Sequence, residues 1–172
     1  MKIKAALSWS LALILLAGCT RDGSGEAGPA PTAEKTPESI YYFETDGTEI
    51  RVNRPAEEIR GLTDKAKSVY EMPLCGLEGK ELTYDMGHYE VDIIETEEYS
   101  KVYSVVFTDD AVTTREGIYI GETAEKVIET YGEPDEREDN SITYTDKDSK
   151  LVFIMQGGNV CSIQYCSSQP GL

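Results

Sequence analysis

The sequence has little of several residue types on which common functions depend. Its 172 residues include one histidine and one tryptophan, and 16 lysine and arginine residues stand against 32 aspartate and glutamate residues. A single histidine, His88, excludes a zinc site built from several histidines. So acidic a surface repels phosphate backbones, which excludes nucleic acid as a partner. We therefore expect no metal site, no cofactor and no nucleic-acid partner.

The sequence also lacks an apolar run long enough to remain as a membrane-spanning helix. Residues 5–16 are mostly apolar and follow Lys2 and Lys4, which is typical of a secretory signal peptide over residues 1–18. Its removal takes away two lysines and no acidic residue, so the formal net charge changes from −16 to −18. We therefore expect an extracytoplasmic protein.

The end of this run, Leu16-Ala17-Gly18-Cys19, resembles the lipobox of bacterial lipoproteins. The resemblance implies that Cys19 carries a thioether-linked diacylglycerol and becomes the new N-terminus. Two acyl chains hold a protein firmly, because each buried methylene adds about 0.8 kcal/mol. We expect the protein on the outer surface of the cell membrane, reached through this lipid. An ordinary signal peptide with a chance cysteine is the alternative.

Residues 19–38 are rich in glycine, proline, serine and threonine and have no apolar period, which predicts a disordered tether. Residues 39–172 are enough for one globular domain. Asp46-Gly47 between two strand-like runs predicts a hairpin at its start, and residues 55–61 predict a short helix. Further strands are predicted over residues 67–71, 80–85, 89–95, 101–108, 141–145, 150–155 and 159–165.

Residues 117–134 give the clearest pattern in the chain. Ile118 and Ile120 alternate as in a short strand, and four apolar residues from Ala124 to Tyr131 then recur with helical spacing. Gly132 and Pro134 end this helix.

The same order of strand, helix and strands occurs twice, over about residues 48–108 and 116–166. We therefore predict an α+β fold of two tandem repeats, each a helix plus an antiparallel meander. Neither repeat can bury its apolar face alone, so the repeats are expected to form one continuous antiparallel sheet with both helices on one face.

Residues 48–165, approximately, resemble known protein families through the following motifs. Gly-Ile-x-Ile-Gly, then Tyr131-Gly132-x-Pro134 and a tyrosine-bearing strand, resembles the repeat of the β-lactamase-inhibitor-protein-like and SmpA/OmlA lipoprotein folds. Residues 75–80 and 107–110 are similar to uncharacterised surface lipoproteins of Gram-positive bacteria. The resemblance implies a fold and an anchored extracellular protein, and it implies no activity.

Three cysteines remain once Cys19 carries lipid. Cys161 and Cys166 lie on one strand, roughly 16 Å apart, beyond the reach of a disulfide. Cys161 shares its parity with apolar Ile163, so it is expected to point inward. If a disulfide forms, we predict that it joins Cys75 to Cys166.

The remaining polar features favour simple structural roles. His88 is predicted to be a solvated turn residue, and the sequence indicates no group to orient it as a base. Residues 146–150 begin like a calcium loop, but a hairpin turn explains them better. Residues 109–110 and 133–139 are predicted to be solvated acidic loops, with weak calcium binding as the alternative. Tyr42 and Tyr119 are candidates for exposed aromatic contacts.

The sequence therefore predicts a lipid-anchored, non-enzymatic module that binds another protein or an envelope component through the sheet face opposite the helices. Two alternatives stay open. One is a protease or β-lactamase inhibitor that uses a protruding loop, and the other is a hydrolase built on carboxylates, which would need a carboxylate pair in a concave cleft.

Overall fold

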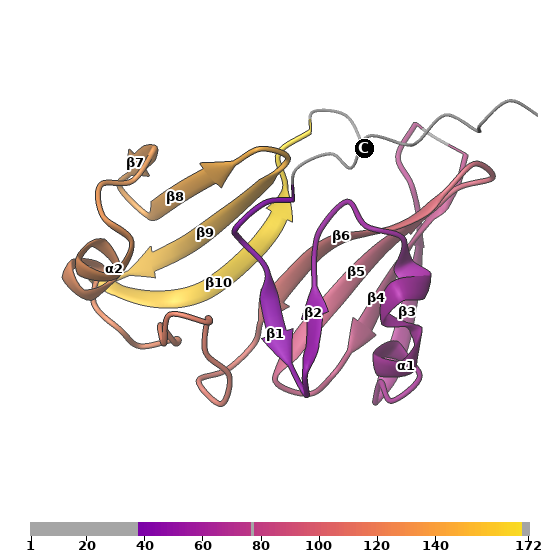
Figure 1. The fold of residues 1–172 in the computed structure, drawn as a ribbon, viewed down its shortest axis with the longest axis horizontal. Helices are drawn as coiled ribbons and strands as arrows, with labels where there is room; N and C mark the ends of the chain where they lie inside the picture. The colour runs from indigo at the N-terminus through magenta and orange to yellow at the C-terminus, as the bar shows by residue number, and fades with distance from the viewer. Residues whose placement is uncertain (1–37, 77, 170–172) are drawn as a thin grey trace, which may run out of the picture. The chain divides into compact units, whose positions relative to one another are not determined.

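A computed structural model of the chain describes residues 38–76 and 78–169 (Figure 1). These residues belong to one compact unit. Its strands are β1 (Phe43–Thr45), β2 (Thr48–Ile50), β3 (Ser68–Pro73), β4 (Lys80–Asp85), β5 (Tyr89–Glu95), β6 (Ser100–Phe107), β7 (Glu136–Glu138), β8 (Ser141–Asp146), β9 (Ser149–Gln156) and β10 (Asn159–Ser167). Its helices are the 3-10 helix η1 (Ala56–Ile59), α1 (Arg60–Thr63) and α2 (Ala124–Tyr131).

Eight strands form one antiparallel sheet in the order β3-β4-β5-β6-β10-β9-β8-β7. The sheet consists of two four-stranded meanders, β3–β6 and β7–β10, which meet where β6 pairs with β10. Strands β1 and β2 form a separate hairpin (Figure 1). A mainly antiparallel sheet with short helices agrees with the predicted α+β class.

The predicted strands of the meanders lie close to the observed ones. Strands β4 and β5 have the predicted bounds, and the other strands predicted there differ by one or two residues at an end. Asp46 and Gly47 both adopt positive φ angles, and so do Gly157 and Gly158. This is the backbone conformation that a two-residue hairpin turn requires, so both predicted turns are confirmed.

Two predictions for the connecting segments were wrong. Residues 117–120 form an irregular segment and no strand, although Ile118 is buried. The Ile118 N–H donates to the Thr114 hydroxyl at 3.0 Å, so a tight loop, rather than a sheet, holds this isoleucine in the core. Strand β7 lies in a predicted acidic loop and pairs with β8. All three of its residues are exposed and charged, which leaves no alternation for sequence reasoning to detect.

Helix α2 has the predicted position. Its N-cap Thr123 accepts a hydrogen bond from the Lys126 N–H at 3.2 Å, and Gly132 ends the helix with a φ of 85°. Val127 is fully buried, while Ile128 and Tyr131 pack partly buried against the core.

Strands β6 and β10 each contain a β-bulge. The pairing of β6 with β5 shifts by one residue at Tyr103, and the pairing of β10 with β9 shifts at Cys161. A bulge leaves one residue unpaired and changes which face the neighbouring side chain points to. Cys161 is therefore exposed, and the prediction that it points inward was wrong.

The residue before each bulge holds the segment that leads into a helix. The Val102 C=O and N–H groups bond to residues 53 and 54, at 2.7 and 3.0 Å, just before η1. The Val160 C=O and N–H groups bond to residues 121 and 122, both at 2.8 Å, just before α2. Both helices are thus positioned by the last strand of a meander.

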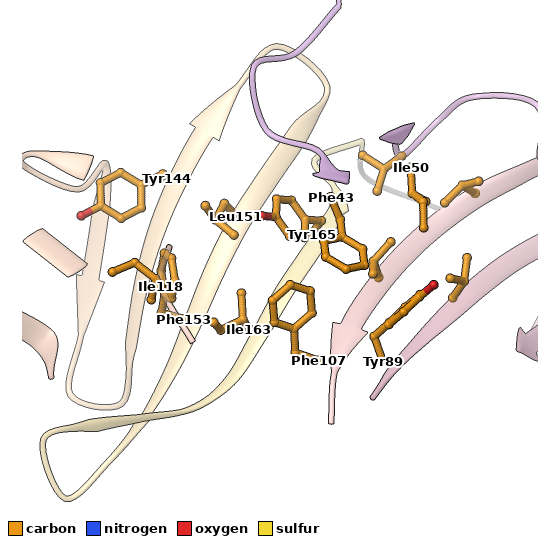
Figure 2. Close-up of a cluster of buried hydrophobic side chains, with 14 of the residues drawn as sticks. Phe43, Ile50, Tyr89, Phe107, Ile118, Tyr144, Leu151, Phe153, Ile163 and Tyr165 are labelled. Carbon is orange, nitrogen blue, oxygen red and sulfur yellow. The ribbon is translucent and has the colours of Figure 1, made fainter. Parts of the chain in front are cut away.

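Buried side chains from the sheet, the β1–β2 hairpin and the helices form one hydrophobic core (Figure 2). Phe43 of β1 lies at its centre, with ring centroids 4.9 Å from Tyr89, 4.8 Å from Phe107 and 6.4 Å from Tyr165. Because Phe107 ends β6 and Tyr165 is on β10, the hairpin packs across the line where the meanders join.

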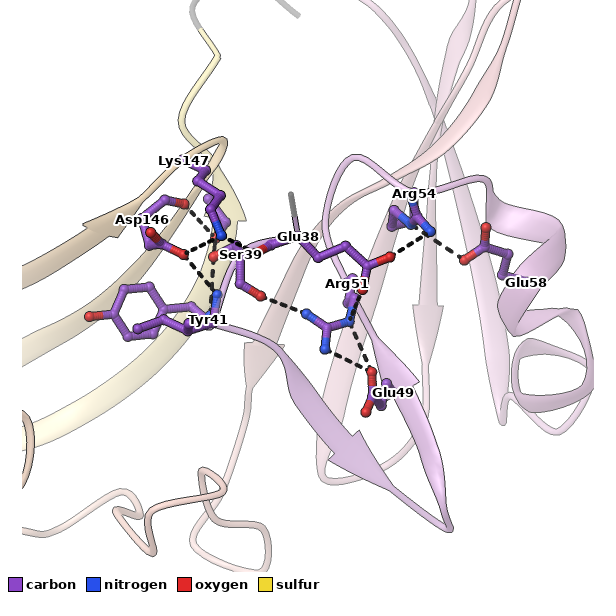
Figure 3. Close-up of polar contacts among 11 residues, drawn as sticks. Glu38, Ser39, Tyr41, Glu49, Arg51, Arg54, Glu58, Asp146 and Lys147 are labelled. Atoms are coloured by element: carbon purple, nitrogen blue, oxygen red, sulfur yellow. Dashed lines mark hydrogen bonds and ion pairs between the residues drawn. The ribbon is translucent and has the colours of Figure 1, made fainter. Parts of the chain in front are cut away.

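The first described residues are hydrogen-bonded to the hairpin and to the β8–β9 turn (Figure 3). The Ile40 N–H donates to the Asp146 carboxylate at 2.8 Å, and Arg51 donates to the Ser39 carbonyl at 2.6 Å. Glu38 also lies 3.6 Å from the Arg51 guanidinium. These contacts fix residues 38–40 against the rest of the compact unit.

Residues 1–37 lie outside the described part of the chain, and with them Cys19, the predicted signal peptide and nearly all of the predicted tether. Among the described residues no helix is both long and apolar enough to cross a membrane.

Replacing Phe43 with alanine tests the role of the hairpin in the core. Loss of this buried ring should lower the free energy of unfolding by about 3–5 kcal/mol, measured by denaturant titration. Glu44→Ala, at the exposed neighbouring position, should change it by less than about 0.5 kcal/mol. Equal effects of the two substitutions would show that the hairpin does not pack on the sheet.

Candidate functional site

The described residues enclose a cleft of about 430 Å³ between the helices η1 and α1 and strands β4 to β6. Its volume falls within the range of small-ligand sites. Its lining residues are Pro55, Ala56, Glu57, Arg60, Thr63, Asp64, Leu82, Tyr84, Ile93, Glu95, Tyr99, Ser100 and Lys101.

The cleft lies where the helical segment over the first meander, η1 followed by α1, ends in a small side chain, Thr63. The Thr63 hydroxyl donates back to the Arg60 carbonyl at 3.2 Å, and Thr63 lines the cleft. In the second meander, the Tyr131 ring lies 5.2 Å from Tyr144 and 5.4 Å from Phe153. The hollow at the other end of α2, which is lined by Ala124, measures about 140 Å³.

The cleft combines an apolar floor with charges of both signs. Leu82 and Tyr84 are partly buried, and Ile93 is 3 % exposed. The carboxylates of Glu57, Asp64 and Glu95 line the cleft, as do Arg60 and Lys101. The Lys101 ammonium also lies 4.9 Å from the centre of the Tyr99 ring, within cation–π range. This lining suits a ligand that has an apolar part and polar or charged ends.

The sheet face opposite the core is the surface that the sequence indicated for a partner. Cross-strand partners share a face, so Thr83, Asp92 and Ser104 form one row there. The Thr83 hydroxyl donates to one Asp92 carboxylate oxygen at 2.7 Å and the Ser104 hydroxyl donates to the other. Nearby, burial and then the Asp92 charge raise the pKa of the Glu81 carboxyl. The polar groups of this row are therefore bonded to one another.

His88 lies exposed in the β4–β5 turn, as predicted, but it has a partner that sequence reasoning missed. Its Nδ1 lies 2.7 Å from an Asp109 carboxylate oxygen. The hydrogen bond with His88, and a second one from the Ala111 N–H, lower the pKa of Asp109. Asp109 follows β6, and the β5–β6 pairing brings it to this turn. The spacing of 21 residues gave no signal for the contact.

The cysteines are free in the described structure. Strands β4, β5 and β6 lie between β3 and β10, so Cys75 in the β3–β4 turn and Cys166 on β10 are at least roughly 14 Å apart across the sheet. A disulfide needs Cα atoms within about 7 Å. The structure therefore does not bring the two disulfide candidates together.

The predicted acidic loops do not gather into a metal site. The described residues contain no group of three or more histidine, cysteine, aspartate or glutamate side chains that could hold a metal ion. Asp146 and Ser149 are paired at the end of the β8–β9 hairpin, which confirms the hairpin turn. Tyr119 is 40 % exposed, while Tyr42 is half-buried with the Arg51 guanidinium 3.8 Å above its ring.

Comparisons of the chain with family models, with curated proteins and with solved structures found no match.

Thiol reactivity tests the bulge at Cys161. In full-length variants that keep one cysteine each, Cys161 should react with a thiol reagent about tenfold faster than Cys166, because Cys166 is partly buried and burial raises the pKa of its thiol. The rate is followed by absorbance at a fixed pH. A Cys161 thiol slower than Cys166 would contradict the bulge.

Proposed function

We propose that this protein is a lipid-anchored extracytoplasmic binding module without enzymatic activity, whose cleft receives a side chain of a protein or envelope partner. The cleft between η1, α1 and the sheet is the observation that carries the proposal. A floor of Leu82, Tyr84 and Ile93 would hold an apolar group, and Arg60, Lys101 and the carboxylates would fix its orientation.

The proposal includes a duplicated unit, over about residues 48–108 and 116–166, with both helices on one face of the sheet. The bulges at Tyr103 and Cys161 support it, since each lies in the last strand of a meander and next to that meander's third strand. The matching bonds of Val102 and Val160 to the segments before the helices support it further. Ile59 of η1 and Val127 of α2 belong to the same buried cluster.

Duplication explains why only one half has a large cleft. One copy keeps Tyr131 over its strands and is closed, while the other has a helical segment of the same length, η1 followed by α1, that ends in the smaller Thr63. A duplicated unit can lose packing on one side because the other half still supplies core, and the opened side then gains room for a ligand. The difference between the copies thus favours a binding role for the first half.

The resemblance to β-lactamase-inhibitor-protein-like and SmpA/OmlA folds, and to Gram-positive surface lipoproteins, remains part of the proposal. The lipobox-like Leu16-Ala17-Gly18-Cys19 supports anchoring at Cys19. The net negative charge supports a membrane contact that is made through lipid rather than through anionic headgroups.

The carboxylates of Glu57, Asp64 and Glu95 in the cleft favour a second candidate, a carboxylate-based glycoside hydrolase. Hydrolysis of a glycoside that is lost in Glu95→Gln would replace the binding proposal with this one.

The anchor is tested by Cys19→Ser. The variant should not incorporate an alkyne analogue of palmitate during growth and should leave the membrane fraction, because it lacks the thiol that carries the diacylglycerol. Cys161→Ser serves as the control and should be labelled like the unchanged chain. Labelling that persists in Cys19→Ser would refute the anchor.

The cleft is tested in intact cells with a photo-reactive benzoylphenylalanine at residue 60, on its rim, and at residue 129, on the exposed side of α2. Adducts on illumination should be several-fold more abundant at residue 60, because only there would a partner be held close.

Thr63→Tyr gives the first-half helix the kind of ring that closes the second half at Tyr131. It should suppress the adduct at residue 60 while the melting temperature shows that the fold persists. An adduct that forms equally well with the filled cleft would contradict the proposed site.

A further inference from the structure

Strand β3 forms one end of the eight-stranded sheet, and its outer edge pairs with no strand in the described part of the chain. Val69, Tyr70 and Met72 are 50 %, 57 % and 53 % exposed. The opposite end of the sheet is the three-residue strand β7, in which every residue is charged. Short charged strands protect a sheet edge from pairing, whereas a longer apolar edge leaves it open to a further strand.

The register of β3 shows which backbone groups point outward. The Leu74 N–H donates to the Gly79 carbonyl at 3.3 Å and continues the β3–β4 ladder. Hydrogen-bonded and non-hydrogen-bonded pairs alternate in an antiparallel ladder, so Met72 and Tyr70 direct their N–H and C=O groups toward β4. Val69 and Glu71 direct theirs outward, and neither is hydrogen-bonded through its backbone to any other described element.

Val69 and Glu71 direct their backbone groups outward and lie on either side of Tyr70. The edge of β3 can therefore pair with an identical edge turned around Tyr70. We infer that β3 pairs antiparallel with β3 of a second copy of this chain, about a two-fold axis at Tyr70. Val69 of each copy then lies opposite Glu71 of the other, and the two pairs exchange four backbone hydrogen bonds. The two Tyr70 side chains meet as a close, non-hydrogen-bonded pair on the sheet face opposite the core, and Met72 lies opposite Ser68.

The charges on β3 favour a second copy over a charged peptide. Glu71 is the single charged residue of the strand, and the Lys80 ammonium already lies 3.1 Å from its carboxylate. Two such edges therefore meet without an unbalanced charge, while a basic peptide would find no free carboxylate on the strand itself.

The area of the interface indicates a weak dimer. Half-exposed Val69, Tyr70 and Met72 would bury on the order of 300 Å² per copy, below the roughly 800 Å² per partner of a stable complex. Confinement of anchored copies to one membrane would raise their effective concentration. The pairing is independent of the proposed cleft and rests on the proposed function only for the anchor.

Disulfide trapping tests the register. In the full chain with Cys75, Cys161 and Cys166 replaced by serine and Cys19 kept as the proposed anchor, Tyr70→Cys places two thiols at the axis, with Cα atoms about 4.5 Å apart, within disulfide range. Mild oxidation should yield a covalent dimer on a non-reducing gel. Met72→Cys is the matched control, because it is equally exposed on the same strand and face but lies roughly 13 Å along the interface from its copy.

Glu71→Pro in the Tyr70→Cys background removes one outward N–H per copy and should reduce trapping several-fold, whereas Glu71→Gln, which keeps the N–H, should not. Equal trapping at positions 70 and 72 would overturn the inference, and so would trapping that a folded Glu71→Pro leaves unchanged. If Glu71→Pro fails to fold, the comparison of positions 70 and 72 still decides. Absence of any dimer at position 70 would overturn the inference as well.

Discussion

The pairing of β6 with β10 is the contact on which the rest of this structure depends. It joins the two meanders through three residue pairs, in which Val105 and Tyr165 lie opposite each other on the core side. Without it, each meander would expose an edge and half of an apolar face, and a four-stranded sheet with one short helix has little else to cover that face. Phe43 packs against both Phe107 and Tyr165, so the hairpin holds this junction from the core side.

The way the meanders join also decides which strands remain at the edges. Because the last strands pair in the middle, the first strands, β3 and β7, lie at the two ends. Strand β7 is short and charged, whereas β3 has six residues and exposes Tyr70 and Met72. The helices show the same difference between a closed second half and an open first half. Helix α2 covers its strands with Tyr131, whereas α1 leaves the cleft beside Tyr84. Both surfaces proposed for binding therefore lie on the first meander.

Much of the fold was predictable because its strands have one buried and one solvated face. In β5, Tyr89, Val91 and Ile93 alternate with polar residues, and the turn glycines mark the hairpins, so the strand bounds followed from local sequence. The bulge at Cys161 was missed because Cys161 continues the alternation of Ile163 and Tyr165, although buried Val160 lies out of phase with them. The contact of His88 with Asp109 and the enclosure of the cleft were missed for a related reason: each joins segments far apart in the chain.

The sequence by itself determined the acidic composition, the position of the candidate lipid-bearing Cys19, the class of fold and the place of most strands, since these depend on residue type and short-range spacing. The tertiary structure alone decided the order of strands, the two bulges, the separation of Cys75 from Cys166 and the volume left beside Thr63. These features arise from pairing and packing between distant segments. Their energy depends on how side chains fit together in space, which local alternation does not encode.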